Sequence, residues 1–547
     1  MNKTSEFRLV RPVDVAVSGA SFSSDAGGTY FDREGVLRTA PANTLRVTYD
    51  PADLSKAPYA LIEKSKTNFI RNNSMQGAAL GSPGASPANW SIPTAWNGLD
   101  RTIVDFGVED GIQFIEVRYA GTIAGSSTTF FDFDSAGASP ALPGQVWALS
   151  AFVRLTAGSL GPLVCQLQLD ERSASMRLRE TFESQGKPHI QPSTAPLSRQ
   201  RRTHLLTTRE DGTLYVHSRL RIGVGAGATG ESIDFTIRIG QPQLERDEVT
   251  SPIKTSGTAV TRAADVVGPG AGLVYSNVPI EEPAYSAVAT YDASQKVHDP
   301  TTGESYLSLS GGNVGRSLAD IAFWLPMGPI NRRLAFDKAV NSQSKNPDLL
   351  VYAIVPGALV SDVMLLNISG ARVTVEQPAS GYRRTVSLVS HEVTNWYEFY
   401  AEQPQWVGDA YFENLVPHAA GPIIIIIEAP GSTAALGCAF LGKSKVIGHT
   451  LDSLEAGVIS YSSTKTDAQG NMRMVRRPNA RRMSCDVYVK DEMKNEVYRL
   501  LSEFTDVELA VVASSKYTMT YQYGYLGQWS VPLRRNEPVR IEFKGLI

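Results

Sequence analysis

Alternation of apolar and polar side chains is the clearest pattern in the first half of the chain. Between residues 231 and 239, Ile and Phe alternate with Ser, Asp, Thr and Arg. A period of two places successive side chains on opposite faces of a strand, so this segment predicts a half-buried β-strand. Gly240 and Pro242 end the pattern, and residues 250–264 are rich in Ser, Thr, Pro and Gly. This change predicts that a domain closes here and a linker follows.

The same alternation recurs in other parts of the chain. Upstream, the alternating segments are residues 112–119, 128–133, 145–155, 163–169, 214–222 and 232–239. Short strands at this spacing, without helical patterns between them, predict a two-sheet β-sandwich or jelly roll for residues 67–248. Downstream, residues 331–446 predict a second sandwich. Its run of isoleucines at 423–427 predicts a central strand, because the run is apolar on both faces.

The C-terminal part changes to a helical period. Met493, Val497, Leu500, Leu501 and Phe504 fall on one face of a predicted helix. Strands predicted at 484–489, 508–512 and 539–543 would form the sheet on which this face packs. Residues 447–547 are therefore predicted to form a small α+β domain.

The predicted fold class is mainly β, with modular β-sandwich or jelly-roll domains and a small C-terminal α+β domain. The remaining predicted segments are a leader or hairpin at 1–66, a linker at 249–279 and a small β module at 280–330. In that module, Val297-His298 and Ser305-Tyr306 flank a turn at 300–303. This arrangement predicts a hairpin.

Composition narrows the classes of partner. The 547 residues carry a formal net charge of −3, with a pI near 6.2. No strong global field would therefore draw the chain to nucleic acid or to an anionic membrane. The longest apolar run, 423–427, is too short to span a bilayer, and residues 1–12 contain no apolar signal core. We expect folding in a cytoplasm, without nucleic-acid binding or membrane insertion.

Cofactor and catalytic signatures are sparse. Cys165, Cys438 and Cys485 are the only cysteines, which argues against a disulfide framework or a cysteine-rich metal site. A structural calcium ion in the jelly roll stays open, and no other cofactor is predicted. Asp132 and Asp134 would lie about 7 Å apart on one strand face, a separation that suits an inverting glycosidase. Any Asp-x-Asp in a strand meets that test, so the chain is predicted not to be an enzyme.

Sugar recognition requires aromatic faces beside amide and carboxylate groups. Trp90 and Trp96 flank a loop that contains Pro93 and Gly98, so a ligand-facing position stays open for them, whereas Trp147 is predicted to lie in the core. The candidate glycan ligands are Trp90, Trp96, Asn89, Asn97, Gln166 and Gln168. Gln166 and Gln168 alternate with Cys165, Leu167 and Leu169, so they are predicted to share one exposed face. That face is either a binding surface or simply solvated.

A group of arginines precedes the predicted helix. Its members are Arg473, Arg476, Arg477, Arg481 and Arg482. No aromatic residues are interleaved with them, which disfavours a single-stranded nucleic-acid site. A solvated face and a contact with an acidic neighbouring subunit remain the two interpretations.

Several longer runs resemble known families. YFD-x-x-GVL-x-TA-x-AN-x-x-R at 30–46 and ALIEKSKTNFIRNNSMQGA at 60–78 resemble a leader in tail and virion proteins of tailed bacteriophages. This resemblance implies that residues 1–66 serve as a virion anchor or arm. NWSI at 89–92, PGQVWALSAFVRL at 143–155 and IRIGQPQLE at 237–245 resemble parts of jelly-roll carbohydrate-binding modules. Residues 280–330 resemble a small chitin-binding-type module, although Tyr285 stands where that module usually has Trp.

The C-terminal segment resembles a domain of a phage tail family. That family shows a GxxxDYS element, a TDxxGN turn, a KRMS strand and a Y-G-F/Y-L-x-x-W/F-x-V segment. The corresponding runs here are GVISYS at 457–462, TDAQGN at 466–471, RRMS at 481–484 and YGYLGQWSV at 523–531. Ser460 departs from the family pattern, which has Asp at that position.

These resemblances imply a non-enzymatic structural component of a tailed-phage virion, in the tail, baseplate, collar or fibre. The jelly roll would contribute to host attachment by binding a surface glycan. A purely structural adaptor that joins other virion proteins is the alternative, and a glycan depolymerase is the least favoured class. The expected partners are other tail, baseplate or collar proteins and further copies of this chain in a trimer or ring. The expected location is the virion, after assembly in the host cytoplasm.

Overall fold

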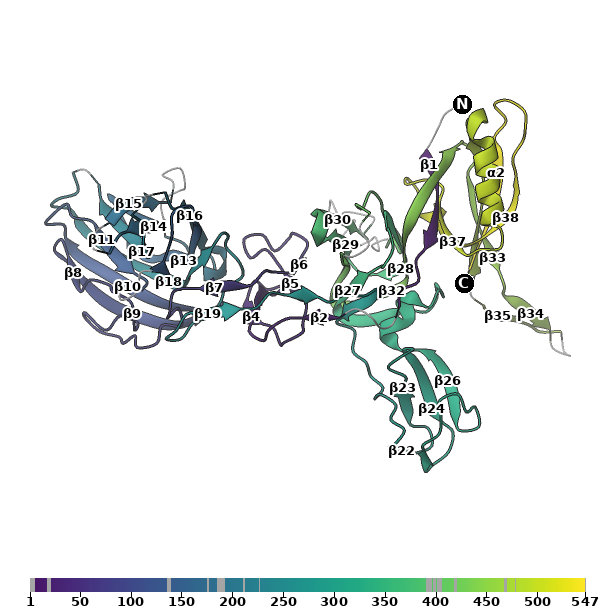
Figure 1. The fold of residues 1–547 in the computed structure, drawn as a ribbon, viewed down its shortest axis with the longest axis horizontal. Helices are drawn as coiled ribbons and strands as arrows, with labels where there is room; N and C mark the ends of the chain where they lie inside the picture. The colour runs from purple at the N-terminus through teal and green to yellow at the C-terminus, as the bar shows by residue number, and fades with distance from the viewer. Residues whose placement is uncertain are drawn as a thin grey trace. The chain divides into compact units, whose positions relative to one another are not determined.

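The computed structural model describes residues 5–16, 21–134, 139–174, 177–183, 192–209, 212–225, 227–389, 396, 400, 406–417, 421–466, 470–477 and 479–546. The chain is mainly β, which confirms the predicted fold class, and it forms two compact units (Figure 1). Unit 1 comprises Met1–Ser21 and Val267–Ile547, and unit 2 comprises Phe22–Val266. The predicted leader, residues 1–66, is therefore divided between the two units.

Unit 2 contains an antiparallel β-sandwich. Its six-stranded sheet has the order β16-β13-β18-β10-β9-β8, and its five-stranded sheet joins β11, β17, β14 and β15, with β12 paired to β17. The elements are β8 (Ala95–Trp96), β9 (Leu99–Glu109), β10 (Ile112–Thr122), β11 (Thr129–Asp132), β12 (Ser139–Pro140), β13 (Val146–Ser159), β14 (Leu163–Arg172), β15 (Arg177–Phe182), η1 (Leu197–Arg199), β16 (Arg201–Thr207), β17 (Tyr215–Val224) and β18 (Ser232–Arg246). Apolar side chains between the sheets form the core, where Tyr119, Phe131, Trp147 and Phe235 are fully buried.

The strand predicted at 232–239 is the first half of β18. Ile233, Phe235, Ile237 and Ile239 are buried in the core, as the alternation predicts. The strand does not end at Gly240, which corrects the sequence-based boundary. The register of β18 against β13 shifts between Ser150, which is opposite Gln243, and Phe152, which is opposite Gly240, and Gln241 takes a positive φ of 38°. A β-bulge thus carries the strand past Pro242 to Arg246.

The remaining elements of unit 2 bring residues 22–66 together with residues 249–266. They are β2 (Phe22–Ser23), β3 (Thr29–Phe31), β4 (Leu37–Thr39), β5 (Arg46–Thr48), β6 (Tyr59–Leu61), β7 (Lys66–Asn68) and β19 (Val260–Arg262), with β20 (Val266–Val267) at the unit boundary. β7 pairs with β19. The buried Arg46 guanidinium lies 2.8 Å from Glu63 and 2.6 Å from Asp265. The segment predicted as a linker is therefore bound to the leader by buried ion pairs.

Unit 1 is built on a 13-stranded sheet. Its elements are β1 (Ser5–Pro12), β21 (Gly272–Ser276), β27 (Ser344–Val355), β28 (Asp362–Ser369), β29 (Arg372–Gln377), β30 (Tyr382–Ser387), β31 (Ala410–Phe412), β32 (Ile423–Thr450), β33 (Glu455–Ser460), β36 (Asn479–Tyr488), β37 (Leu509–Val512), β38 (Tyr521–Ser530) and β39 (Val539–Gly545), with η2 (Asn331–Phe336) and η3 (Pro378–Ser380). Residues 423–427 are fully buried and pair with both β27 and β29, which confirms the predicted central strand. β32 crosses the predicted boundary at 446, so the two predicted domains share one sheet.

The rest of unit 1 consists of smaller elements. They are β22 (Thr290–Tyr291), β23 (Lys296–His298), β24 (Glu304–Ser308), β25 (Asn313–Val314), β26 (Trp324–Pro329), β34 (Ser463–Thr466), β35 (Met472–Val475), η4 (Asp491–Met493), α2 (Lys494–Glu503) and η5 (Thr518–Thr520). β23 pairs with β24, which confirms the predicted hairpin in the small module. Val497 and Leu501 of α2 are buried against the sheet, as the helical pattern predicts. None of the described helices is both long and apolar enough to cross a membrane.

Candidate functional site

The two tryptophans predicted to face a glycan are buried. Trp90 is 6% exposed and Trp96 is 7% exposed. The Trp90 indole donates a hydrogen bond to the Asn72 carbonyl oxygen at 2.6 Å, and the Trp96 indole donates to the Ser127 carbonyl oxygen at 2.7 Å. Each ring also packs edge-on against a core aromatic ring. Since neither ring face reaches solvent, the prediction that they form a sugar platform is wrong.

Asn89 and Asn97, which were also predicted to bind a glycan, stabilise the local backbone instead. Asn97 donates to the Ser127 carbonyl oxygen at 2.7 Å and accepts from the Ser127 hydroxyl at 2.6 Å. Asn89 and Asn97 both adopt a positive φ, at 70° and 49°. Asn tolerates this left-handed conformation better than most residues. The two residues therefore shape the turns beside the tryptophans.

Gln166 and Gln168 lie together on β14, on the face of the five-stranded sheet opposite the core. The sequence predicts that this face is exposed, but Gln166 is 7% exposed and Gln168 is 0% exposed. The difference arises because partner strands bring long side chains beside them: Arg219 and Arg221 of β17 are directly opposite Gln168 and Gln166. The Gln168 amide also donates to Asp170 at 2.6 Å. The two glutamines are thus part of a buried polar layer.

Strand register arranges this layer in three rows, which we call the polar face. The rows are Phe130–Arg221–Gln166, Asp132–Arg219–Gln168–Phe182 and His217–Asp170–Glu180. Directly opposite residues on antiparallel strands hold their side chains about 5 Å apart. Residues that are separated by up to about ninety positions in the sequence therefore meet on one surface. Of these side chains, Phe130, Asp132, Phe182 and Arg221 are partly exposed, and Glu180 is exposed.

Arg219 is the central charge of the polar face. Its guanidinium lies 2.9 Å from Asp132 and 2.9 Å from the fully buried Asp170. It also lies 4.3 Å from the centre of the Phe130 ring, in cation–π contact. Burial raises the pKa of both carboxyl groups, although the positive charge of Arg219 opposes this shift. The arrangement is a buried arginine held by two carboxylates beside an aromatic ring.

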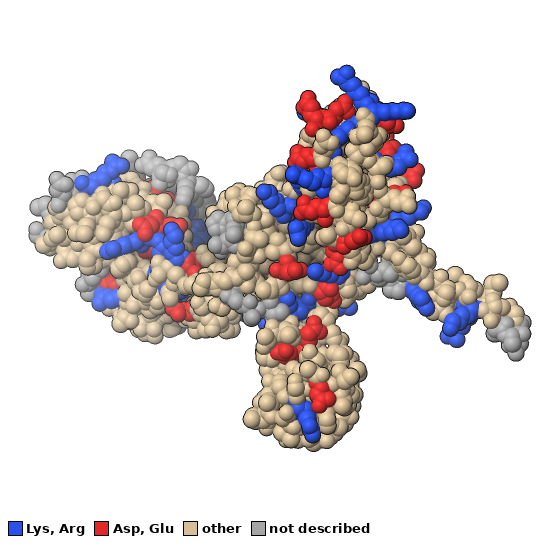
Figure 2. Space-filling model, turned by 45° about the vertical axis from the view of Figure 1, so that its right-hand side comes forward, with Lys and Arg blue, Asp and Glu red and all other residues tan. Residues whose placement is uncertain are grey.

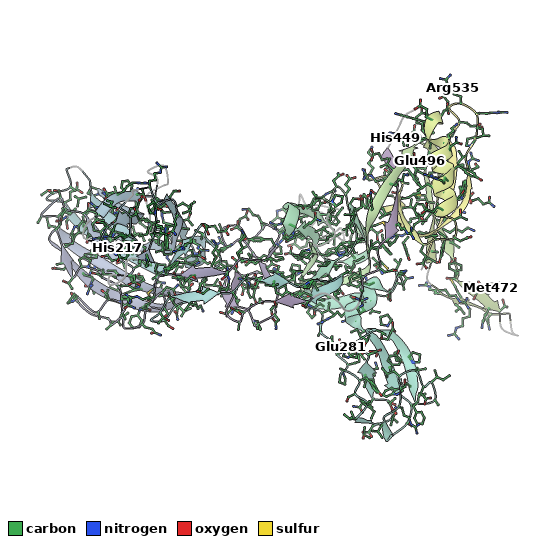
Figure 3. The ribbon with its side chains drawn as sticks, viewed as in Figure 1. His217, Glu281, His449, Met472, Glu496 and Arg535 are labelled. Atoms are coloured by element: carbon green, nitrogen blue, oxygen red, sulfur yellow. The ribbon has the colours of Figure 1, made fainter. Side chains whose placement is uncertain are left out.

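His217 and Gln168 leave two hydrogen-bonding atoms without a described partner. Nδ1 of His217 lies 2.9 Å from Nη2 of Arg219 and therefore accepts a hydrogen bond, so the ring proton is on Nε2 (Figure 3 labels His217). Nε2 of His217 lies 3.8 Å from Oδ1 of Asp132, beyond hydrogen-bond distance, and Oε1 of Gln168 has no described hydrogen-bond partner. A buried polar atom without a partner costs about 1–3 kcal/mol. Neither atom reaches solvent, so both belong to the interior of the polar face.

Replacing His217 with asparagine is expected to make unit 2 less sensitive to acid. Burial, together with the charges of Arg219 and Arg172, lowers the pKa of His217 to about 3. In the unfolded chain this pKa is about 6.5, so the unfolded state binds more protons between these values and stability falls as the pH falls. His217 should account for roughly 3 kcal/mol of the stability lost between pH 7 and pH 4. Denaturant unfolding of both proteins at the two pH values checks this.

Comparing the wild type with His217→Asn isolates the contribution of His217 to the pH dependence of stability. Asp132 and Asp170 shift in the opposite sense, because their pKa is raised in the folded protein, but both carboxyl groups are present in the variant as well. Equal pH dependence in the wild type and in His217→Asn would contradict a buried neutral imidazole.

The carboxylates considered for catalysis do not act as a pair. Asp132 binds Arg219, whereas Asp134 forms an ion pair with Arg71 at 2.5 Å. β11 ends at Asp132, so the two residues do not continue one strand face. Within the described residues, no three His, Cys, Asp or Glu side chains gather as a metal site. The geometry of the polar face therefore suits binding through hydrogen bonds and an aromatic edge.

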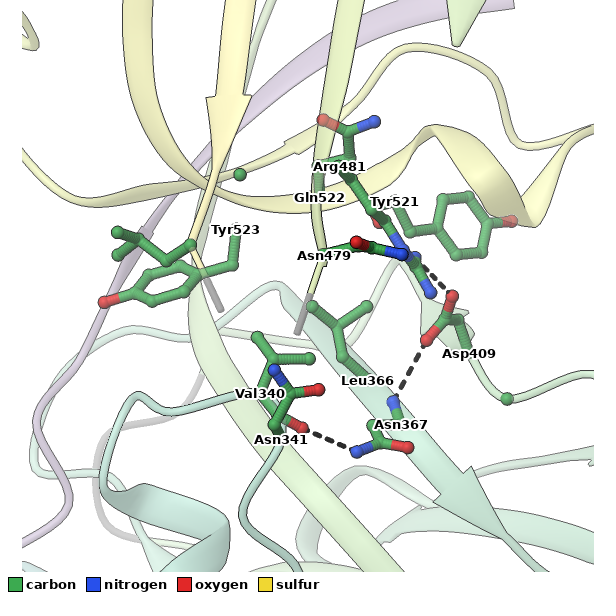
Figure 4. A pocket seen from close by; sticks show the side chains of 13 residues that line it. Val340, Asn341, Leu366, Asn367, Asp409, Asn479, Arg481, Tyr521, Gln522 and Tyr523 are labelled. Carbon is green, nitrogen blue, oxygen red and sulfur yellow. Dashed lines mark hydrogen bonds and ion pairs between the residues drawn. The ribbon is translucent and has the colours of Figure 1, made fainter. Parts of the chain in front are cut away.

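The arginines near the C-terminus separate into two groups. Arg481 forms an ion pair with Asp409 at 2.5 Å and donates to the Tyr521 carbonyl oxygen at 3.1 Å, beside a cavity of about 250 Å³ (Figure 4). This ion pair lies within unit 1 and leaves the Arg481 side chain 41% exposed, so a contact of Arg481 with another subunit stays a prediction. Arg473, Arg476, Arg477 and Arg482 are exposed.

Comparison with known proteins gives only weak likenesses. No family model and no curated protein matches the chain. Among solved structures, an allantoicase is 8% identical and covers 69% of this chain and 90% of its own, with a TM-score of 0.13. A CBM22 tandem from Paenibacillus barcinonensis is 9% identical over 71% and 100% (TM-score 0.20), and a striped-bass fucolectin is 9% identical over 70% and 99% (TM-score 0.15). These scores are too low to support an inference about ligand or activity.

Proposed function

We propose that this chain is a non-enzymatic component of a tailed-phage virion and that it binds a surface glycan through the polar face of unit 2. The sequence runs at 30–46, 60–78 and 457–531, which resemble phage virion proteins, support the virion role. The polar face is the observation that supports glycan binding. It combines aromatic edges, carboxylates, amides and arginines, the groups that bind the hydroxyls and apolar faces of a sugar.

The alternative function, a structural adaptor, draws support from a different observation. The burial of Trp90 and Trp96 removes the aromatic platform that the sequence suggested. An adaptor would use the sandwich only to contact other virion proteins. A depolymerase is not favoured, because Asp132 and Asp134 are each bound to a different arginine.

A glycan array probed with the full chain and with an Arg221→Met variant tests the proposed binding. Arg221 is partly exposed on the polar face, and methionine keeps much of its length but removes the guanidinium donors. Loss of one buried hydrogen bond to a ligand costs about 1–3 kcal/mol. We therefore expect the variant to bind about 10–100-fold more weakly to the glycans that the wild type selects.

Arg118→Met provides the matched control. Arg118 is about half-exposed on β10 in the other sheet. This variant should bind like the wild type. Failure of the wild type to select any glycan, or equal losses in the two variants, would favour the adaptor.

A further inference from the structure

The hairpin of β34 and β35 forms a separate two-stranded sheet in unit 1. It projects from the part of unit 1 that contains β33 and α2 (Figure 1). None of the residues in its two strands is buried. A two-stranded hairpin is at best marginally stable in water unless another surface covers it. Both faces of the hairpin are therefore accessible to a partner.

The two faces differ in chemistry. Met472 and Met474 lie opposite Thr466 and Thr464 on one face. Their side chains are 79% and 62% exposed, and Figure 3 labels Met472 on this hairpin. Methionine side chains are flexible and polarizable and adapt well to apolar or aromatic surfaces. One face of the hairpin is thus an uncovered apolar surface.

The other face is basic. Lys465 lies directly opposite Arg473, and like charges in this position destabilise a strand pair. Arg476 and Arg477 follow. Figure 2 shows basic side chains, and no acidic ones, on the described part of the hairpin. The ion pairs of this part of unit 1 join other residues: Lys445–Glu496, Arg481–Asp409, Lys494–Asp491 and Arg540–Asp486.

The charge of the chain favours another copy as the partner. Residues 463–477 contain four of the 52 basic residues and one of the 55 acidic residues. The rest of the chain therefore carries a formal net charge of −6, compared with −3 for the whole. The hairpin is basic and the rest of the chain is slightly acidic, so its charge is complementary to the net charge of the rest of a second copy.

A suitable groove lies in the same part of unit 1. It has a volume of about 340 Å³ and is lined by Leu451, Asp452, Leu454, Ala456, Ser514, Tyr517, Met519 and Thr520. Tyr517 and Met519 are half-exposed on its wall, at 50% and 58%. Asp452 and Glu455 are exposed at its edge. The groove is therefore apolar inside, with carboxylates beside it.

The hairpin cannot reach the groove of its own chain. The groove contains Leu454 and Ala456 at the start of β33, whereas the hairpin begins after the end of β33 at Ser460. Six residues of strand span about 20 Å. The two surfaces therefore lie at opposite ends of one strand. Such a head-to-tail arrangement closes into a ring or continues as a filament.

We propose that the β34–β35 hairpin of one copy docks in this groove of a second copy. Met472 and Met474 contact Tyr517 and Met519, and the basic side chains of the hairpin lie near Asp452 and Glu455. This proposal rests on the virion role proposed above and identifies a surface for self-assembly. It does not depend on glycan binding.

Sedimentation of the full chain over a range of concentrations tests the contact. The wild type is expected to assemble, whereas the double variant Met472→Ser/Met474→Ser and the groove variant Met519→Asp should each need at least about tenfold higher concentration, a change of about 1.4 kcal/mol. A mixture of the two variants should form dimers and nothing larger, since each copy keeps one intact surface. Ile321→Ser, which changes an 80%-exposed side chain of the small module, should assemble like the wild type.

Other results would overturn the proposal. These are a monomeric wild type, variants that assemble like the wild type, or a hairpin that binds DNA in a wild type that stays monomeric. Glycan binding by the assembly-deficient variants distinguishes failure of this contact from failure of the polar face.

Discussion

Replacing Arg219 with alanine is expected to lower the free energy of unfolding of unit 2 by about 3–5 kcal/mol, because a buried ion pair loses one partner. Asp170 is fully buried and would keep its carboxyl group without the arginine 2.9 Å away. The loss should be largest near neutral pH. Acid should restore part of the stability, since protonation removes the unpaired charge from a carboxyl group whose pKa burial already raises. Denaturant unfolding, followed by tryptophan fluorescence, measures both effects.

Arg118→Ala is the matched control for Arg219→Ala. Arg118 also binds an aspartate, Asp234, at 2.6 Å, but both side chains are about half-exposed on the six-stranded sheet. An exposed ion pair contributes about 0–1 kcal/mol. Equal losses in the two variants would contradict the central role of Arg219 in the polar face. The Arg219 variant should also lose glycan binding, whereas the Arg118 variant should keep it.

Replacing Arg46 with alanine is expected to destabilise unit 2 by a similar amount, about 3–5 kcal/mol. Arg46 joins Glu63 to Asp265 and also donates to the Thr29 carbonyl oxygen and the Ser251 hydroxyl. Its side chain and that of Asp265 are each 2% exposed. Without Arg46, residues 22–66 lose the ion pair with Asp265, and the ion pair between Arg262 and Glu63, at 3.0 Å, still joins them to residues 249–266. Limited proteolysis should therefore cleave both segments faster, and the denaturation midpoint should fall.

Arg38→Ala controls for the loss of an arginine in the same segment. Arg38 binds Asp32 at 2.6 Å, but its side chain is 55% exposed, so the expected loss is below about 1 kcal/mol. If Arg46→Ala were as stable and as protease-resistant as Arg38→Ala, the buried ion pairs of Arg46 would not be what holds residues 249–266 to residues 22–66.

Local periodicity was sufficient to predict most of the strands and the one long helix described. Ile233, Phe235 and Ile237 point into the core, and Val497 and Leu501 face the sheet under α2. Strand ends were harder to predict. Gly240 and Pro242 normally interrupt a strand, but a β-bulge accommodates them here, and bulges depend on the partner strand. The same holds for β1, whose place between β32 and β37 depends on residues more than four hundred positions away.

The candidate site was predicted only in part. The alternation around Gln166 and Gln168 correctly separates them from the core face of β14. It does not reveal Arg219 and Arg221, since strand register brings these in from about fifty positions away. The predicted exposure of Trp90 and Trp96 was wrong for the same reason. Their loop composition suggests exposure, but each indole N–H finds a carbonyl oxygen elsewhere in the chain, and that contact stabilises the buried ring.

A density map of the intact virion with this chain placed in it tests the central claim most directly. We expect the chain to occupy the tail or an attached structure, with the polar face of unit 2, around Phe130 and Phe182, open to solvent. A polar face enclosed by neighbouring subunits would contradict glycan recognition and identify the chain as an adaptor. A particle without this chain would contradict the virion role itself.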